Sequence, residues 1–299
     1  MSALPQSSAL RRMAGLMPAL LVIGIFMLGP LCIIAAYSFM EASPYGGVRP
    51  EFSFGAYRQF LFDLDLDDSL IFNPAYLNIV ARSVVLAVAA TSLSLVLGFP
   101  AAYYIATRPP HWRTVLLLLV TIPFWTNLLI RTFAWILILR DDGLINSVLM
   151  WLGATDAPLR LLYTDGAIAV GLIYSYLPFM VLPIYASLEK IDMRLVEAAH
   201  DLHANRLQAM WRVILPLAKP GIIAGSILVF IPSLGAFIAP DLLGGGRRLM
   251  IGSLIHMQFS SSRNWPFGSA VAMILLAVVL VLMLVYARNA GRGRGEAAR

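Results

Sequence analysis

The chain has 299 residues, of which 60% are hydrophobic and only 13% are charged, and its mean hydropathy is +0.80. Soluble domains are only about half apolar, so this composition excludes an ordinary soluble protein and indicates an integral membrane protein. The single cysteine, Cys32, excludes a disulfide within the chain and a thiol metal site.

Six apolar stretches are long enough to cross a membrane, because a bilayer core needs roughly 20 apolar residues per helix. In chain order the expected spans are 14–39, 79–106, 114–139, 166–188, 220–240 and 268–287. The first run is longer than a signal-peptide core of about 7–15 residues, so we expect it to remain as an uncleaved helix. The predicted fold class is an all-α polytopic membrane helix bundle with six transmembrane helices.

The charge distribution predicts the orientation of this bundle. The termini and the segments near 107–114 and 189–220 carry 13 Lys/Arg and 5 Asp/Glu, whereas 40–82, 140–165 and 241–268 carry 8 and 11. An excess of Lys and Arg marks the cytoplasmic side, so both termini and the 189–220 segment are expected inside the cell. The excess of basic over acidic residues is therefore explained by the membrane topology, and nucleic acid is not an expected partner. The basic, glycine-rich residues 289–299 are expected to form a flexible tail that touches lipid headgroups.

Two absences bear on the energy source. Neither Lys190 nor Lys219 lies in a phosphate-binding Gly-x4-Gly-Lys-Ser/Thr loop. No span carries an acidic residue near its middle, as ion-coupled carriers usually do. The clearest charge within a span is Arg131, which lines a path or pairs with a partner subunit, or else snorkels to the outer interface or bonds backbone carbonyls.

No catalytic or metal site is predicted either. A Gly-x-Ser-x-Gly nucleophile motif is absent. His200 and His203 have the spacing of two metal ligands, but no carboxylate or thiol completes a tetrahedral set at a familiar spacing.

The segment 189–218 is predicted to form two short amphipathic helices joined by a bend. Asp192 and Asn205 are good N-caps, and Pro216 and Pro220 are expected to end the second helix. Apolar residues recur at i, i+3, i+4 and i+7, namely Leu195, Ala198, Ala199 and Leu202, then Leu207, Met210, Trp211 and Ile214. Three uses remain open: an interfacial helix, packing on the chain's own bundle, or docking of another protein, for which the small alanines beside Glu197 and Arg206 are suited.

The same stretch, "EAAHDLHANRLQAMWRVILPLAKPGI", resembles the EAA loop of ABC-importer permeases. Glu197-Ala198-Ala199 match the start of that pattern and Ile214-Leu215-Pro216 match its end, whereas His203 stands at the usual glycine position. The stretches 122–139, 177–192, 232–246 and 264–270 resemble the spermidine/putrescine permease subfamily. The resemblance covers residues 75–288 approximately.

The resemblance implies a type I ABC-importer permease fold, with one transmembrane domain over 1–299, a core bundle at about 75–288 and a multi-pass position in a bacterial inner membrane. It implies a transport subunit and not an enzyme. Two separate ATPases would bind ATP and Mg, a second homologous permease would complete the pore, an external solute-binding protein would deliver the substrate, and this chain would hold no cofactor. The implied ATPase-coupling residues are Glu197, Ala198, Ala199, His203, Asn205 and Arg206.

His203 raises a structural question. Glycine adopts positive φ freely, whereas another residue loses about 1–2 kcal/mol there. Either the bend is not left-handed in this chain, or the turn is strained.

The resemblance favours a polyamine substrate. Another small solute is the alternative within the family, and an ion-coupled carrier is the alternative outside it. Candidate residues of the translocation path are Trp125, Tyr174, Tyr176 and Asp241, because ring faces and carboxylates bind cations, together with Arg131 as the clearest charge within a span. Aromatic residues in membrane helices also serve as packing or interface anchors. The acidic loop Asp63–Asp68 suits a cation or a binding protein, or is simply solvated.

Overall fold

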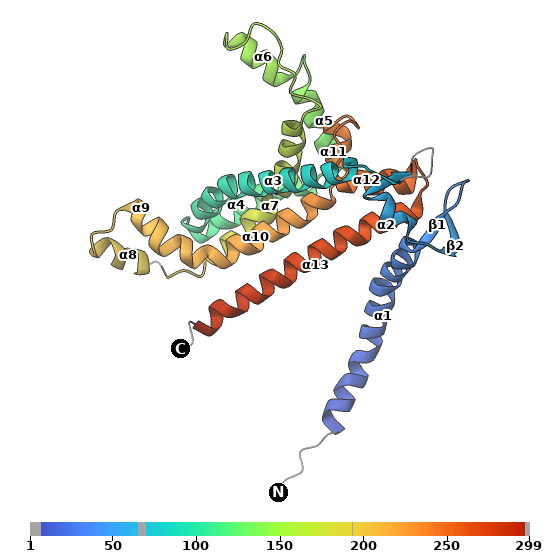
Figure 1. The fold of residues 1–299 in the computed structure, drawn as a ribbon. Coiled ribbons are helices and arrows are strands. Elements are labelled where there is room, and N and C mark those ends of the chain that lie inside the picture. The colour runs from blue at the N-terminus through green and yellow to red at the C-terminus, as the bar shows by residue number, and fades with distance from the viewer. Residues whose placement is uncertain (1–6, 65–69, 193, 297–299) are drawn as a thin grey trace. The chain divides into compact units, whose positions relative to one another are not determined.

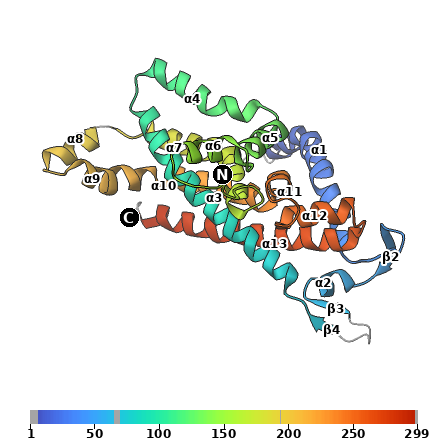
Figure 2. The same ribbon diagram turned by 90° about the horizontal axis from the view of Figure 1, so that it is seen from above.

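The computed structural model describes residues 7–64, 70–192 and 194–296 (Figures 1 and 2). The chain forms two compact units. The terminal unit comprises Met1–Tyr76 and Ile255–Arg299, and the central unit comprises Leu77–Leu254. Each unit has its own packing.

The terminal unit is built from two long helices and two short β-hairpins. Helices α1 and α13 pack against each other, and Tyr37 stacks on Trp265 with ring centroids 6.3 Å apart. Strands β1 and β2 pair antiparallel, as do β3 and β4. The elements are α1 (Ser7–Ser38), β1 (Met40–Ala42), β2 (Val48–Phe52), α2 (Gly55–Gln59), β3 (Phe62–Leu64), β4 (Leu70–Phe72) and α13 (Trp265–Glu296).

Two predictions from the sequence concern residues of this unit. The sequence predicts a flexible tail over 289–299, and helix α13 continues through part of that range to Glu296. A helix that is already nucleated extends by one hydrogen bond per added residue, which offsets the poor helix propensity of the glycines. Of the predicted acidic loop, Asp63–Asp68, residues 65–68 lie outside the described residues.

In the residues that the structure describes, the central unit consists of helices and the loops that connect them, without strands. Helices α8 and α9 lie at one end of α10, and α11 lies at the other (Figures 1 and 2). The elements are α3 (Ala75–Ala106), α4 (Pro110–Trp125), α5 (Leu128–Leu139), α6 (Leu144–Trp151), α7 (Asp165–Leu188), α8 (Arg194–Asp201), α9 (Arg206–Ala209), the π-helical turn η1 (Met210–Ile214), α10 (Leu215–Gly235) and α11 (Ile238–Leu243). Helix α12 (Ile251–Ser260) is divided between the two units, since the central unit ends at Leu254.

The predicted membrane spans agree with the helices at five of six positions. Within the described residues, five helices are long and apolar enough to cross a membrane: Leu20–Ser38, Ala75–Ala106, Asp165–Leu188, Arg206–Gly235 and Trp265–Leu284. A sixth span is present only if α4 and the α5–α6 segment, which meet at 90°, count as one. The predominantly helical, multi-pass prediction is confirmed.

The third predicted span, 114–139, is wrong as a straight helix. It breaks at Thr126, whose backbone is extended, after Pro123 in the last turn of α4. Asn127 then begins α5, because its side-chain oxygen accepts a hydrogen bond from the Leu129 N–H at 2.8 Å. An apolar run shows no periodic signal at such a break, and only the Pro and the Asn cap mark it.

The fifth predicted span is also shifted. The helix begins at Arg206, runs through Pro216 and Pro220, and ends at Gly235. The expectation that these prolines end the helix is therefore wrong. The π-helical turn η1 lies where the ring of Pro216 would meet the preceding turn, and the Leu215 N–H donates to the Met210 carbonyl, five residues back. This wider turn accommodates the proline without stopping the helix.

Helix α7 is the centre of the central unit, and small residues let its neighbours approach it closely. Met180 is fully buried, between Gly98 of α3 and Gly225 of α10. Gly221, one turn before Gly225, lies against the Pro183 carbonyl and the Ser187 side chain. Glycines four residues apart are a common way to bring membrane helices together.

Candidate coupling surface and translocation path

The segment between α7 and α10 forms the predicted pair of helices and bend. The Asp192 carboxylate accepts a hydrogen bond from the Arg194 N–H at 3.0 Å, at the start of α8. Asn205 caps the second helix through a reciprocal pair of bonds with Gln208, at 2.8 and 2.9 Å. Both N-caps predicted from sequence are present.

His203 occupies the left-handed region with φ of 63°. The His203 N–H donates to the His200 carbonyl and the Ala204 N–H donates to the Ala199 carbonyl, at 2.9 and 3.0 Å. These two bonds form a Schellman motif, which usually places glycine at this position. The second alternative left by the sequence is therefore correct, since a histidine holds a backbone conformation that costs about 1 kcal/mol.

We predict that His203→Gly raises thermal stability slightly and leaves ATP-coupled transport intact. The histidine side chain is exposed, so its loss removes no buried contact, and glycine relieves about 1 kcal/mol of backbone strain. Thermal unfolding and substrate-stimulated ATPase activity of the assembled transporter measure both effects. Loss of ATPase stimulation would instead show that the imidazole itself contacts a partner.

One side of the segment packs on the central unit. Val196, Ala209 and Ile214 are buried in a cluster that also contains Ile184 and Leu188 of α7. The opposite side presents apolar side chains to the surface, with Leu202 83%, Leu207 67% and Trp211 63% exposed. The apolar residues predicted at i, i+3, i+4 and i+7 are thus divided between the two sides. Most of them are exposed and face away from the chain's own core.

All six predicted coupling residues lie in this segment. Ala199 is half-buried and the other five are exposed, on α8 (Glu197 and Ala198), at the bend (His203) and at the start of the second helix (Asn205 and Arg206). Together with Leu195, Leu202, Leu207 and Trp211 these residues form what we name the coupling surface. The four apolar members were not among the coupling residues predicted from sequence. The available signal was Val196, which makes α8 apolar on two sides, one packed on its own core and one exposed.

A polar cluster ties the coupling segment to the preceding helices. The Tyr185 hydroxyl donates to Glu189 Oε1 at 2.7 Å, and Arg113 Nη1 lies 3.6 Å from the same oxygen. Arg113 Nε also donates to the Arg108 carbonyl at 2.6 Å. Glu189 therefore joins the end of α7 to the start of α4, next to the segment that carries the coupling surface.

We predict that Glu189→Gln lowers the transport rate modestly, by about twofold to fivefold, because a half-exposed ion pair contributes at most about 1 kcal/mol. Its effect should appear in the coupling of ATP hydrolysis to uptake. Asp142→Asn is the matched control, since it removes a more exposed pair, Arg140 with Asp142 at 3.8 Å. Equal effects of the two variants would deny Glu189 any role in coupling.

Two of the predicted translocation-path residues, Arg131 and Tyr176, are connected through aromatic rings. Arg131 is 9% exposed, and within the described chain its Nε and Nη1 have no hydrogen-bond partner. Its guanidinium carbon lies 5.8 Å from the Phe124 ring, Phe124 is 5.0 Å from Phe179, and Phe179 is 6.3 Å from Tyr176. Of the alternatives left by the sequence, bonds to backbone carbonyls from these two nitrogens therefore do not describe Arg131. Phe124 and Phe179, which connect Arg131 with Tyr176, were not predicted from sequence.

The other predicted path residues lie apart from this chain of rings. Tyr174 contacts Trp135 edge to face at 5.7 Å. Trp125 is 84% exposed at the end of α4, and Asp241 lies in α11.

Tyr176 lines a cavity of about 140 Å³ with Ser175 and the break between α10 and α11, residues 235–239. The arrangement brings Tyr176 and Arg131 toward one region and does not gather all five residues.

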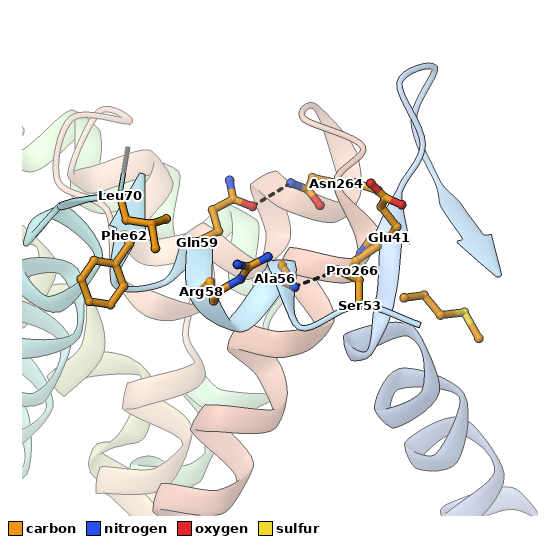
Figure 3. Close-up of a pocket in the computed structure, with 12 residues that line it drawn as sticks. Glu41, Ser53, Ala56, Arg58, Gln59, Phe62, Leu70, Asn264 and Pro266 are labelled. Atoms are coloured by element: carbon orange, nitrogen blue, oxygen red, sulfur yellow. Dashed lines mark hydrogen bonds between the residues drawn. The ribbon is translucent and has the colours of Figure 1, made fainter. Parts of the chain in front are cut away.

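The terminal unit holds a further polar cavity, of about 460 Å³ (Figure 3). Glu41 and Arg58 line it, and Asn264 Nδ2 donates to Gln59 Oε1 at 3.4 Å. No residue predicted from sequence lies in this cavity.

Comparison with known proteins identifies the family. Residues 94–292 match the model of the binding-protein-dependent transport system inner membrane component. The chain belongs to this family. It is the membrane-spanning transport subunit of an ABC importer, a multi-pass protein of the inner membrane whose ATPase is a separate subunit.

Individual relatives agree with this assignment. The chain is 41% identical over 264 residues to the spermidine/putrescine transport system permease protein PotB of Escherichia coli (strain K12), covering 88% of this chain and 92% of PotB. It is 46% identical over 218 residues to the PotB of Haemophilus influenzae, covering 73% and 76%. The crystal structure of a bacterial ABC transporter that imports the acidic polysaccharide alginate matches with a TM-score of 0.68 at 18% identity, over 95% of this chain and 98% of that chain. This ABC-importer permease therefore has the type I fold.

Proposed function

We propose that this permease carries polyamines such as spermidine and putrescine through an ATP-driven importer. The observation that carries the proposal is the 41% identity to a spermidine/putrescine permease over 88% of the chain. The aromatic side chains Tyr174, Tyr176 and Trp125 and the carboxylate of Asp241 are the proposed cation-facing groups, because ring faces and carboxylates attract amines.

The proposed assembly contains two ATPase subunits, a second homologous permease and an external solute-binding protein. ATP and Mg bind to the ATPases, and this chain holds no cofactor and binds no nucleic acid. Its lipid-facing helices contact membrane lipid, and both termini lie in the cytoplasm. The exposed apolar side chains of the coupling surface support the ATPase contact, because Leu202 and Trp211 lack a covering partner within the described chain.

Uptake of radiolabelled spermidine by proteoliposomes that hold the whole complex and its binding protein tests this function. We expect uptake that needs ATP and is competed by putrescine but not by sulfate or an amino acid. Competition by another solute class would retain the importer and reject the polyamine. Uptake by this chain alone, driven by an ion gradient without ATP, would reject the proposed assembly.

A further inference from the structure

Two loops of the central unit enclose a basic pocket. The loop before α7 and the loop between α11 and α12 bound a cavity of about 610 Å³. Its lining consists of Arg160, Tyr163, Thr164, Gly245, Arg247 and Arg248. Three of these six residues are arginines, so the pocket is strongly cationic.

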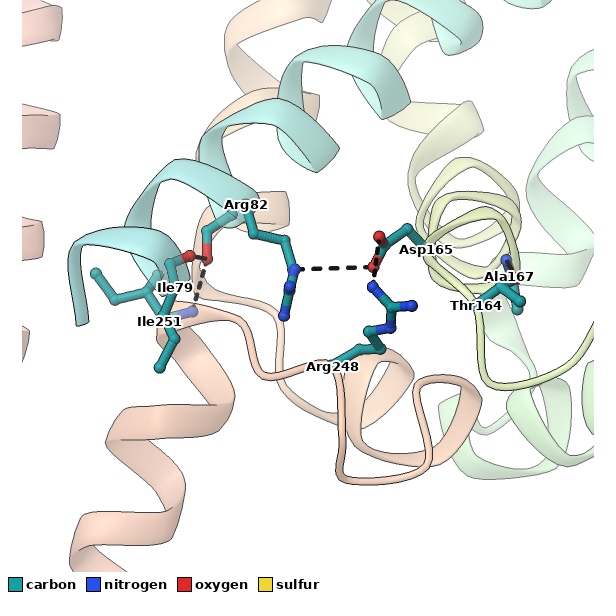
Figure 4. A network of polar contacts seen from close by, with 8 residues as sticks. Ile79, Arg82, Thr164, Asp165, Ala167, Arg248 and Ile251 are labelled. Carbon is teal, nitrogen blue, oxygen red and sulfur yellow. Dashed lines mark hydrogen bonds and ion pairs between the residues drawn. The ribbon is translucent and has the colours of Figure 1, made fainter. Parts of the chain in front are cut away.

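The structure fixes one arginine and leaves two without a carboxylate. Arg248 Nη1 donates to Asp165 Oδ2 at 3.2 Å, and Arg82 Nε lies 3.9 Å from Asp165 Oδ1 (Figure 4). One carboxylate therefore serves two guanidinium groups. Within the part of the chain that the structure describes, neither Arg160 nor Arg247 has a carboxylate within 4 Å. The group as a whole keeps a net positive charge.

The backbone around the pocket is held in an unusual conformation. Tyr163 has φ of 61° and Gly245 has φ of 62°. The Tyr163 N–H donates to the Leu243 carbonyl at 3.0 Å, and the Tyr163 ring occupies the space that a side chain at Gly245 would need. A tyrosine at positive φ costs about 1 kcal/mol or more, so the rest of the fold stabilises the shape of this pocket.

The pocket and the coupling surface lie at opposite ends of α7. Asp165 begins the helix and Leu188 ends it, just before the coupling segment. A helix of 24 residues is about 36 Å long at 1.5 Å per residue, enough to cross the hydrocarbon core. Because the coupling surface is proposed to face the cytoplasmic ATPase, the basic pocket faces the external side.

Charge and lining together restrict the occupant. A cluster of guanidinium groups repels a polyamine, whereas it binds carboxylate or phosphate through paired hydrogen bonds. A lipid headgroup site also needs apolar surface for acyl chains, and the described lining includes no aliphatic side chain. Arg160 and Arg247 are exposed, so they remain accessible to a protein surface.

We propose that this pocket receives acidic side chains of the external solute-binding protein when it docks on the permease. The inference rests on the proposed function for the presence of that protein. It adds the site and its chemistry: Arg160 and Arg247 pair with partner carboxylates, while Asp165 holds Arg248 in place. Complementary charge of this kind accelerates docking and makes it sensitive to salt.

The test uses the complete complex in nanodiscs, with the purified spermidine-loaded binding protein as the probe. The readout is the binding-protein concentration that half-saturates ATPase stimulation, measured at several salt concentrations. For Arg160→Gln combined with Arg247→Gln we expect roughly a tenfold increase in that concentration and a weaker salt dependence. The double variant Arg160→Lys with Arg247→Lys keeps the positive charge, so its half-saturating concentration should increase less than that of the glutamine variant. Arg140→Gln, an exposed arginine on the same external segment, should equal the wild type.

Three results would overturn the inference. The glutamine variant overturns it if its half-saturation and salt dependence equal those of the wild type. A lipid site is indicated instead if removing anionic lipid lowers wild-type activity to that of the variant at unchanged half-saturation. A wild-type complex that no binding protein stimulates would contradict the proposed function itself, and this inference with it. Copurification of the ATPase with each variant shows that the variant is folded.

Discussion

Leu202→Lys is expected to separate the permease from its ATPase without unfolding it. Leu202 is 83% exposed at the end of α8, so the change removes almost no contact inside the chain. A lysine near a helix C-terminus also interacts favourably with the helix dipole. Any large effect of this substitution must therefore come from a partner surface.

The expected size of the effect follows from burial at an interface. Covering an exposed leucine contributes about 2–3 kcal/mol, and placing an ammonium group in the same pocket without a counter-charge costs more. A loss of about 3 kcal/mol corresponds to a decrease of more than 100-fold in affinity. We expect the ATPase to be lost during copurification and ATP-dependent uptake to be abolished.

Leu202→Met is the matched control, because methionine has a similar volume and remains apolar. It should retain both copurification and uptake. Thermal unfolding of the isolated permease should be the same for both variants and the wild type. If Leu202→Lys copurifies normally with the ATPase, Leu202 lies outside the interface and the coupling surface is smaller than we propose.

The sequence predicted the elements whose signals are local. Asp192 and Asn205 are caps because their short polar side chains reach the next backbone N–H groups, and this geometry depends only on neighbouring residues. Long apolar runs likewise located five continuous spans. The left-handed bend at His203 was identifiable as a position, but its conformation depends on the two bonds that close the end of α8.

Other features of the fold depend on contacts between distant segments or on local geometry that cannot be deduced from a single sequence. The break at Thr126 lies inside a run that is apolar on average, so hydropathy gives one span where the structure has two helical segments at 90°. Pro216 looks like a helix end, yet a π-helical turn absorbs it. The pairing of Arg82 and Arg248 with Asp165 joins three distant segments, and no spacing rule predicts such a group. The β-hairpins at 40–72 were missed because each strand has only three to five residues.

Gly221→Ala is expected to destabilise the central unit more than any other single methyl addition that we propose. A Cβ at Gly221 would overlap the Pro183 carbonyl oxygen and the Ser187 Oγ, and would lie 2.8 Å from Ser187 Cβ. The backbone carbonyl cannot rotate away as a side chain can. Helix α10 would therefore have to move from α7 along their shared interface. Overpacking of this kind typically costs about 1–3 kcal/mol.

The matched control is the same substitution at Gly29, a glycine of α1 whose added Cβ meets nothing within 4 Å. There alanine should be neutral or slightly stabilising, since it is the better helix former by up to about 1 kcal/mol. Thermal unfolding in one detergent compares the two variants directly. Equal melting temperatures would show that α7 and α10 tolerate a wider separation than the structure has.

A second substitution separates the two obstacles at Gly221. Adding Ser187→Gly to Gly221→Ala removes the Oγ and Cβ overlaps but leaves the one with the Pro183 carbonyl. We therefore expect partial recovery of the melting temperature. Full recovery would show that the side chain alone sets the spacing of α7 and α10, whereas no recovery would assign it to the carbonyl. Because α10 continues from the coupling segment as one helix, we expect the same contact to affect how motion of the coupling surface reaches the membrane helices. Spermidine uptake should consequently fall at least in proportion to the loss of stability in the single variant and recover with the double variant.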